Sequence, residues 1–488
     1  MRKEALRFPR VPLRLMSARP VAGREKAAGM NQVLLRDRSD AALATVSLGD
    51  MIGALSFALD LTEGQPPGHC LRCAWIGLRI GWECGLDAAT LTDLHFTMLL
   101  KDTGCSSNAG RLWELYGGDE RRVKHAFKTV DAHSLRQVAR FVLRHAGLGE
   151  GLRRRLSRLR RLARDGHDLA ADLIATRCTR GADIVRRLGF SPAVAAAVYA
   201  LDEHWNGGGL PQGLRGAAIP LLARMALLAQ VIDVFHAVGG PDAARREVHR
   251  RSGTWFDPDL VAAFDAAAQI PAFWAGLTDP EIGARVAAIA PPAGELPLDE
   301  DRLDCITEAF ADVIDAKSHF TAGHSDRVAQ YTDAIAARLQ VLPVQRRRLR
   351  RAALLHDIGK LGVSNGILEK PGRLDADEWA AIRRHPAWSE EILARVGAFR
   401  DLAPIAGAHH ERLDGAGYPR GLAGTDIPLE ARIITTADIF DALTAERPYR
   451  GPMPPAEALA LMERDRDRAI DGACLDALRE VVADQTPG

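Results

Sequence analysis

Histidines and aspartates gather at five separated places in the C-terminal half of the chain. They are His324, His356-Asp357, His385, His409-His410 and Asp438. Any one of them could be an ordinary core or surface residue, but together they offer enough nitrogen and oxygen donors for two divalent ions. Imidazole and carboxylate without thiolate suit manganese, iron, zinc or cobalt. Asp357, which carries two oxygens beside His356, is the natural bridge, and two ions so bridged can clamp both oxygens of a phosphoryl displacement.

Helices are the elements that must position these donors. Apolar residues recur every three or four positions in 347–355 and 437–443, without the alternation that is typical of strands. Ala, Leu and Arg are abundant and aromatic residues make up only 6% of the chain, which also favours helices. The sequence therefore predicts an all-α fold.

An internal repeat organises the chain. Residues 209–224 reappear at 417–432, an offset of 208, with ten of the sixteen positions identical. Upstream of this, residues 99–104 align with 354–359 at an offset of 255. The 47-residue difference between the offsets predicts an insertion in the first copy, near 118–165. A duplication of one helical domain explains both alignments.

The repeat divides the chain into three parts. Residues 1–46 form a basic leader that we expect to be disordered, residues 47–290 a first copy, and residues 298–488 a second copy after a Pro-rich joint. Leucines in the insertion make one apolar stripe on an Arg-rich helix; they are Leu152, Leu156, Leu159 and Leu162. A solvated face is the default interpretation of this helix, and an anionic partner is the alternative.

The first copy lacks most of the donors that the second copy offers. His69 aligns with His324 and Asp102 with Asp357, but the remaining donor positions carry Lys101, Arg177, Leu201, Asp202 and Gln230. Cys105 stands where the second copy has Lys360. Charged lysine and arginine cannot ligate a cation and oppose its binding. The first copy is therefore predicted to be a pseudo-enzyme domain that serves dimerisation or sensing.

Composition limits the partners and the location. The 488 residues carry a formal net charge of +1, so charge gives no reason to expect a nucleic-acid polymer as partner. Only two of the seven cysteines form a C-x-x-C pair, Cys70 and Cys73, which we expect to be buried core thiols of a cytoplasmic protein. No uninterrupted apolar run reaches membrane-spanning length, so no membrane association is expected.

One segment of the second copy resembles a known family. Residues 409–419, His-His-Glu-Arg-Leu-Asp-Gly-Ala-Gly-Tyr-Pro, are similar to the signature of the HD-GYP group within the HD superfamily of metal-dependent phosphohydrolases. Further matches spread the resemblance over about 150 residues; they are 356–360 (HDIGK), 369–372 (EKPG), His385-Pro386, Ile427-Pro428, Ala437-Asp438, 441–444 (DALT) and 447–450 (RPYR).

The resemblance implies a tandem of helical HD-superfamily domains whose second member hydrolyses cyclic di-GMP to pGpG or GMP. It implies two metal ions, with iron or manganese favoured. One ion would be held by His324, His356, Asp357 and Asp438, and the other by Asp357, His385, His409 and His410. Some relatives bind a third metal through a glutamate where this chain has Phe320, which favours a two-metal centre.

The resemblance also assigns residues to the substrate and to partners. Lys360 would contact phosphate, and Arg447, Arg450 and Asp441 would contribute to substrate binding. The loop with Gly417, Tyr418 and Pro419 would serve either catalysis or docking of a partner, for which GGDEF-domain proteins are candidates. Another cyclic dinucleotide or a nucleotide monophosphate is an alternative substrate, and a non-catalytic sensor or scaffold is the alternative function. Whether the protein forms a homodimer is left open.

Overall fold

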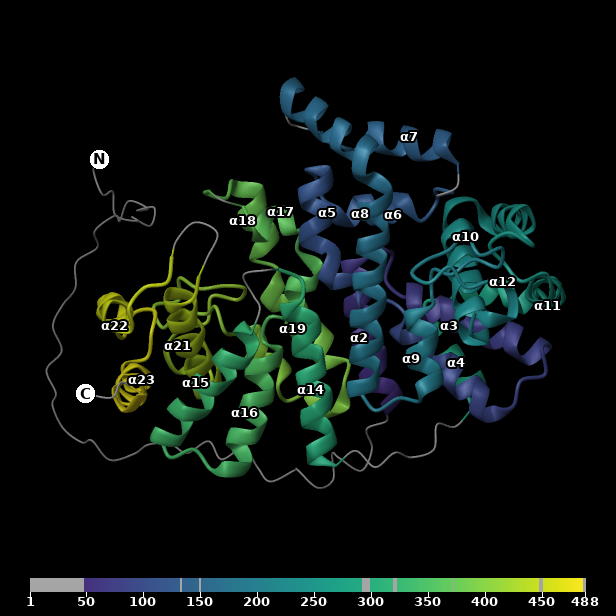
Figure 1. The fold of residues 1–488 in the computed structure, drawn as a ribbon. Coiled ribbons are helices and arrows are strands. Elements are labelled where there is room, and N and C mark those ends of the chain that lie inside the picture. The colour runs from purple at the N-terminus through teal and green to yellow at the C-terminus, as the bar shows by residue number, and fades with distance from the viewer. Residues whose placement is uncertain are drawn as a thin grey trace, which may run out of the picture. The chain divides into compact units, whose positions relative to one another are not determined.

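The computed structural model describes residues 48–131, 134–148, 151–291, 299–318, 323–370, 372–446 and 451–485. Every regular element in these ranges is a helix, which confirms the all-α prediction (Figure 1). The predicted leader, most of the Pro-rich joint, Phe320, Arg447 and Arg450 lie outside the described residues. The described ranges belong to one compact unit, and one hydrophobic cluster of buried residues runs through both copies.

The helices of the first copy precede those of the second along the chain. The first copy contains α2 (Leu48–Thr62), α3 (His69–Glu83), α4 (Ala88–Leu100), η1 (Cys105–Asn108), α5 (Ala109–Tyr116), α6 (Glu120–Phe127), α7 (Leu135–His145), α8 (Leu152–Arg187), α9 (Pro192–Tyr199), η2 (Gly216–Ala218), α10 (Leu221–Arg251), α11 (Pro258–Ala268), α12 (Pro271–Leu277) and α13 (Ile282–Ile289). The second contains α14 (Glu300–Asp315), α15 (His324–Arg338), α16 (Pro343–Leu355), η3 (Ile358–Gly362), α17 (Asn365–Leu368), α18 (Ala376–Ile382), α19 (His385–Ala394), η4 (Gly397–Phe399), α20 (Ala403–Gly407), η5 (Gly424–Asp426), α21 (Leu429–Thr444), α22 (Pro455–Met462), η6 (Glu463–Asp465) and α23 (Gly472–Gln485).

Backbone contacts repeat between the copies at the offsets found in the sequence. Glycines at the start of α3 and α15 adopt positive φ, 85° at Gly68 and 66° at Gly323, where a side chain would be strained. A Cβ on Gly104 would lie 1.9 Å from the carbonyl oxygen of Arg177, and one on Gly359 would lie 2.0 Å from that of His385. In each copy, therefore, the turn that carries the aspartate packs directly against the helix that carries the next donor position.

The loop before α10 and the loop before α21 are closed in the same way. Both carboxylate oxygens of Glu411 accept backbone N–H groups of its loop, from Arg420 at 2.7 Å and Leu422 at 3.0 Å. Glu203 does the same in the first copy. The shared loop sequence thus maintains backbone geometry in both copies, whether or not metal donors are present.

The predicted insertion corresponds to α6, α7 and the first part of α8. Its Arg-rich residues belong to α8, one 36-residue helix that continues past residue 165 to Arg187. Leu152 and Leu156 of the apolar stripe are exposed. The thiols of Cys70 and Cys73 are buried in α3, as predicted.

One described helix, α10, is long and apolar enough to cross a membrane by length and composition alone. It bends at Gly239 and Gly240, whose φ and ψ are not helical, and 67% of its apolar window is buried inside the protein. Core helices of soluble proteins also have these properties.

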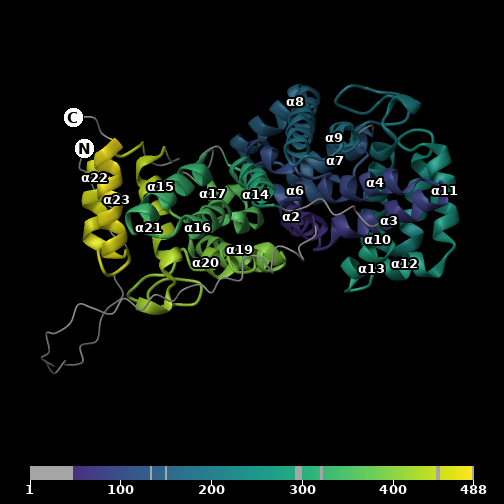
Figure 2. The same cartoon turned by 90° about the horizontal axis from the view of Figure 1, so that it is seen from below.

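The two copies meet along α2, α6, α8 and α14. Helix α2 packs against α3 and α4 of its own copy and also against η3 and α19 of the second (Figure 2). Helix α14 packs against α8 across the same boundary. The segment that carries Asp357 therefore lies beside helices of the first copy.

Candidate metal centre

Asp357 lies at the centre of the predicted donor set. It follows α16, begins the short η3 helix and is almost fully buried. Its Oδ2 atom faces Nε2 of His324 at 3.4 Å and Nε2 of His356 at 3.2 Å. Its Oδ1 atom faces Nε2 of His385 at 3.3 Å and Nε2 of His409 at 3.7 Å. The two oxygens of one carboxylate thus point to two different groups of histidines.

Backbone carbonyls orient three of the histidines. Nδ1 of each ring lies within hydrogen-bond distance of the carbonyl oxygen three residues earlier; the pairs are His356 with Ala353, His385 with Ile382 and His409 with Ala406. A proton on Nδ1 would donate to that oxygen and leave Nε2 as the free lone pair. Nε2 is the atom that faces Asp357 in all three cases. This arrangement could not be predicted from the sequence, because the carbonyls belong to ordinary helical residues.

A carboxylate orients His324 instead. Nδ1 of His324 lies 2.7 Å from Oδ2 of Asp441, and Arg327 donates to both oxygens of Asp441 at 2.6 and 3.1 Å. Burial alone would lower the pKa of His324, but the nearby carboxylates of Asp357, Asp441 and Asp438 raise it to about 9. Asp441, predicted to contact substrate, therefore lies behind His324, with both oxygens already engaged.

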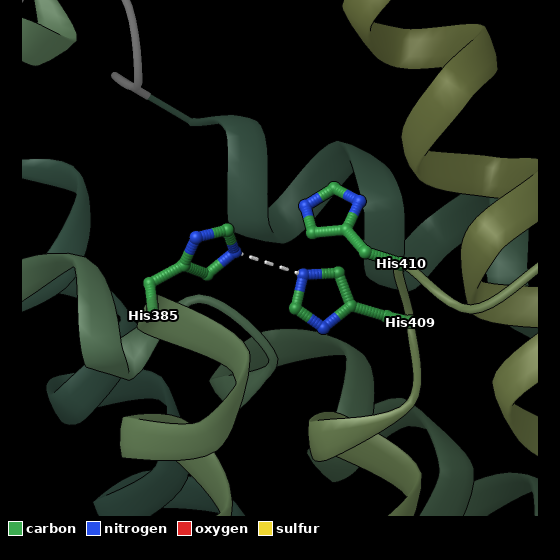
Figure 3. A group of neighbouring side chains, drawn as sticks. All are labelled: His385, His409 and His410. Atoms are coloured by element: carbon green, nitrogen blue, oxygen red, sulfur yellow. Dashed lines mark hydrogen bonds between the residues drawn. The ribbon is translucent and has the colours of Figure 1, made fainter. Parts of the chain in front are cut away.

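The donors form two groups. Ligand atoms of His324, His356 and Asp438 lie within 4.8 Å of one another, as do those of His385, His409 and His410. The three rings of the second group converge from α19 and from the segment after α20 (Figure 3). Nε2 of His385 is 3.2 Å from Nε2 of His409, too close for two protonated nitrogens.

The lowered pKa values of the second group, and the buried atoms of the centre that have no hydrogen-bond partner, fit a cation at each position. Burial, followed by the neighbouring His385, lowers the pKa of His410 to about 3, and burial with its neighbouring histidines lowers the pKa of His409 as well. Neutral imidazole is the form that ligates metals. Three buried atoms that point into the centre have no hydrogen-bond partner in the described structure; they are Nε2 of His324, Nε2 of His356 and Oδ1 of Asp357. Orphaned buried polar atoms are costly, so this donor set fits two divalent ions bridged by Asp357.

Lys360 and Tyr418 border the centre. Nζ of Lys360 donates to Oδ2 of Asp357 at 2.5 Å. The ring of Tyr418 stacks on that of His410 with centroids 4.9 Å apart, and the Arg383 guanidinium lies 4.7 Å from the Tyr418 centroid. A Cβ on Gly417 would lie 2.4 Å from the backbone nitrogen of Arg412, so only glycine fits there. Gly417, Tyr418 and Pro419 therefore place one aromatic wall against a donor histidine.

In the first copy an ammonium group lies at the position of the first donor group. Nζ of Lys101 is 3.1 Å from Nε2 of His69 and 3.2 Å from Oε1 of Gln230, and it donates to Asp102. These three residues align with His324, Asp438 and Asp357. Burial opposes the charge, but Asp102 raises the pKa of Lys101 well above its ordinary value, so the amine is a buried cation.

A second fixed cation replaces the second group. Arg177, aligned with His385, pairs with Asp202, aligned with His410. The orienting contacts remain, since Nδ1 of His69 lies 2.6 Å from Asp233, which also accepts from Arg72. The prediction that the first copy lacks a metal centre rested on missing ligands. The geometry adds that its own side chains supply the positive charge.

Comparisons with known proteins agree with this geometry. The model of the family described as HD domain matches residues 157–260 and 308–474, which fall in both copies. The chain is 52% identical to a 3'3'-cGAMP-specific phosphodiesterase of Vibrio cholerae over 438 residues, covering 90% of this chain and 95% of the relative. It is 39% identical to the cyclic di-GMP phosphodiesterase response regulator RpfG of Xanthomonas campestris, over 35% of this chain and 45% of that protein.

A solved structure shows the same fold. The crystal structure of a cyclic GMP-AMP specific phosphodiesterase of V. cholerae aligns with a TM-score of 0.63 at 48% sequence identity. The alignment covers 90% of this chain and 98% of that one. The shared architecture therefore includes the first copy as well as the second.

Proposed function

Because this chain belongs to the HD-domain family, in its HD-GYP group, we propose that it is a metal-dependent phosphodiesterase that hydrolyses a cyclic dinucleotide. The observation that carries the proposal is the position of Asp357, whose two oxygens face two separate groups of histidines. A binding protein would not need two complete donor groups around one bridging carboxylate.

The residues of the second copy divide between the two ions. His324, His356 and Asp438 would hold one ion, His385, His409 and His410 the other, and Asp357 would bridge them. Such a pair supplies Lewis-acid polarisation of the phosphodiester and a lower pKa for an attacking water. Whether the ions are iron or manganese stays a prediction.

The chain's own side chains prepare the site for a phosphodiester. Lys360 places an ammonium at the rim, 2.5 Å from Asp357, where it can neutralise a phosphate oxygen that approaches the ions. Asp441 and Arg327 fix the ring of His324 from behind, as second partners of metal ligands do. Tyr418, stacked on His410, offers an aromatic wall that a purine base can pack against. Substrate binding by Arg447 and Arg450, and docking of GGDEF-domain proteins at this loop, stay predictions.

For the substrate we propose 3'3'-cGAMP, with cyclic di-GMP as the second candidate. The relative that supports the first candidate matches this chain over nearly its whole length, in both copies, whereas RpfG supports the second candidate over about a third of the chain. The ions and Lys360 would contact phosphates, which the two nucleotides share. Discrimination must therefore come from contacts to the one base that differs.

The test is hydrolysis by protein loaded with manganese or iron, with each nucleotide supplied separately and the linear and mononucleotide products separated by chromatography. We expect turnover of both or of 3'3'-cGAMP alone, with the larger kcat/KM for 3'3'-cGAMP. Asp357→Ala should abolish turnover and lower the metal content, whereas the matched Asp102→Ala should leave the metal content of the second copy unchanged. Tight binding of a nucleotide without turnover under either metal would favour the sensor or scaffold instead.

A further inference from the structure

A buried carboxylate of the first copy reaches into the catalytic segment of the second. Glu120 is the first residue of α6 and has no exposed surface. It accepts a hydrogen bond from Oγ of Ser364 at 2.8 Å, and the backbone N–H of Asn365 donates to both of its oxygens at 3.1 Å. Ser364 and Asn365 form the turn between η3 and α17. The contact therefore begins four residues after Lys360.

Neighbouring groups bind the same short segment. Nζ of Lys317 donates to the carbonyl oxygen of Leu361 at 2.7 Å and lies 3.9 Å from Glu120. Arg121, the next residue of α6, donates to the carbonyl oxygen of Gly362. Backbone groups at 361, 362 and 365 are thus each held by an ionisable side chain, two of which belong to the first copy.

The other end of α6 is anchored beside the degenerate site. Lys124 and Lys128 pair with opposite oxygens of the buried Glu63 at 3.0 and 3.1 Å. Lys124 also donates to the carbonyl oxygen of Cys105 at 2.8 Å, three residues after Asp102. Helix α6 therefore connects the turn that follows Asp102 in the first copy with the turn that follows Asp357 in the second.

We propose that Glu120 is a positioning residue for the catalytic centre, acting through the 358–365 segment on Asp357 and Lys360; this rests on the proposed function. A five-residue 3₁₀ helix has poor hydrogen-bond geometry and little stability of its own, so tertiary contacts must fix it. Asp357 precedes this helix and Lys360 lies within it. Asp357 must face both donor groups at once, and a displacement of about 1 Å can cost roughly 10²-fold in rate.

The inference assigns the first copy a role that needs no ligand of its own. Glu63 and the backbone of Cys105, beside the degenerate site, hold α6 in place. Helix α6 in turn holds the turn that follows Asp357. Glu120 lies in the 118–165 segment that the sequence predicts to be an insertion in the first copy.

The test uses full-length Glu120→Ala and Glu120→Gln, with Asp312→Asn as the matched control. Asp312 pairs with Arg187 and so also joins α14 to α8 across the copies, but no hydrogen bond or ion pair among the described residues links it to 358–365. We expect Glu120→Ala to lower kcat about 10- to 100-fold with KM changed less than about 3-fold. Glu120→Gln should recover most of kcat, because an amide oxygen can still accept from Asn365. Asp312→Asn should match the unmodified protein.

Hydrogen exchange of the metal-loaded proteins supplies a readout that does not need substrate. Amides of 358–368 should exchange faster in Glu120→Ala than in Asp312→Asn, while amides of α21 stay protected in both. Unchanged kcat and exchange in a folded Glu120→Ala would overturn the proposal, and so would equal losses in Asp312→Asn. If the unmodified protein hydrolyses neither nucleotide, the proposed function fails, and the exchange of 358–368 still decides whether Glu120 holds the segment. If Glu120→Ala does not fold, Glu120→Asp takes its place, and unchanged kcat and exchange in that variant relative to Asp312→Asn would overturn the proposal.

Discussion

Replacing Asp441 by asparagine tests whether the carboxylate behind His324 is needed for the metal centre. Oδ2 of Asp441 accepts from Nδ1 of His324 at 2.7 Å, while Arg327 occupies both carboxylate oxygens. An asparagine has one acceptor and one donor. If its oxygen stays with Nε of Arg327, its NH₂ group faces Nδ1 of His324 and favours the tautomer that carries its proton on Nε2. That proton would point at the metal position.

The size of the effect follows from this geometry. Removing a partner that orients a ligating histidine typically weakens metal binding about 10- to 100-fold, which is roughly 1.4–2.7 kcal/mol. The loss should concern the first donor group, because His385 and His409 are oriented by backbone carbonyls that the substitution does not touch. We therefore expect one weakened ion and one nearly unchanged ion per chain.

The assay is titration of metal-free protein with Mn²⁺, with free Mn²⁺ followed by its electron paramagnetic resonance signal. Asp233→Asn is the matched control, since Asp233 contacts His69 and Arg72 as Asp441 contacts His324 and Arg327. It should leave the isotherm unchanged, because Nε2 of His69 already meets Lys101. A Mn²⁺ isotherm of Asp441→Asn that overlays the unmodified protein would refute this account of His324, and so would weakening in Asp233→Asn.

Two further predictions concern buried lysines. Lys101→Met leaves Asp102 buried without its cation, so the free energy of unfolding measured in urea should fall by about 3–5 kcal/mol. The metal content per chain should stay unchanged, and a gain of metal would contradict the assignment of Lys101. Burial lowers the pKa of Lys317 to about 7, against the attraction of Glu120, from an ordinary value of 10.5. Between these values the unfolded chain binds more protons than the folded one, so the free energy of unfolding should rise with pH by up to about 1.4 kcal/mol per unit. That contribution is lost as pH falls towards 7, and Lys317→Met should lack it. If the free energy of unfolding in urea changes equally with pH in Lys317→Met and the unmodified protein between pH 7.5 and 9.5, Lys317 is not held neutral.

Much of the backbone arrangement around the site could be predicted from the sequence because the chain contains this arrangement twice. The offset of 255 paired Gly104 with Gly359 before any coordinate, and the structure gives both glycines the same close contact. The offset of 208 also relates Glu203 to Glu411, whose contacts with their loops match. The donor set was predicted from the imidazole and carboxylate groups at five places in the second copy and from the resemblance to the HD-GYP signature. The insertion near 118–165 stays a prediction, and its second boundary falls inside α8, a helix that runs without interruption through residue 165.

Contacts that depend on side-chain direction could not be predicted. A lysine at 101 could extend to solvent or turn inward, and only the fold shows that its amine meets His69 and Gln230. Asp441 was assigned to substrate from the family motif. Its spacing of three residues from Asp438 on one helix face could have suggested a role behind the metal ligands. Glu120 gave no local signal, since its partner Ser364 is 244 residues away.

The two copies share one arrangement of buried aspartate and histidine but differ in the source of positive charge. Lysine and arginine supply it in the first copy, and metal ions would supply it in the second. Each centre buries an aspartate beside a histidine, and an aspartate left there without a cation would be strongly destabilising. In the first copy the cations stand at the positions of the lost ligands themselves, Lys101 for His356 and Arg177 for His385. One substitution at each position therefore removes a metal ligand and replaces the charge that the metal would bring. If the first copy binds no ions, as predicted, these cations let it keep the rigid frame from which α6 reaches the catalytic turn.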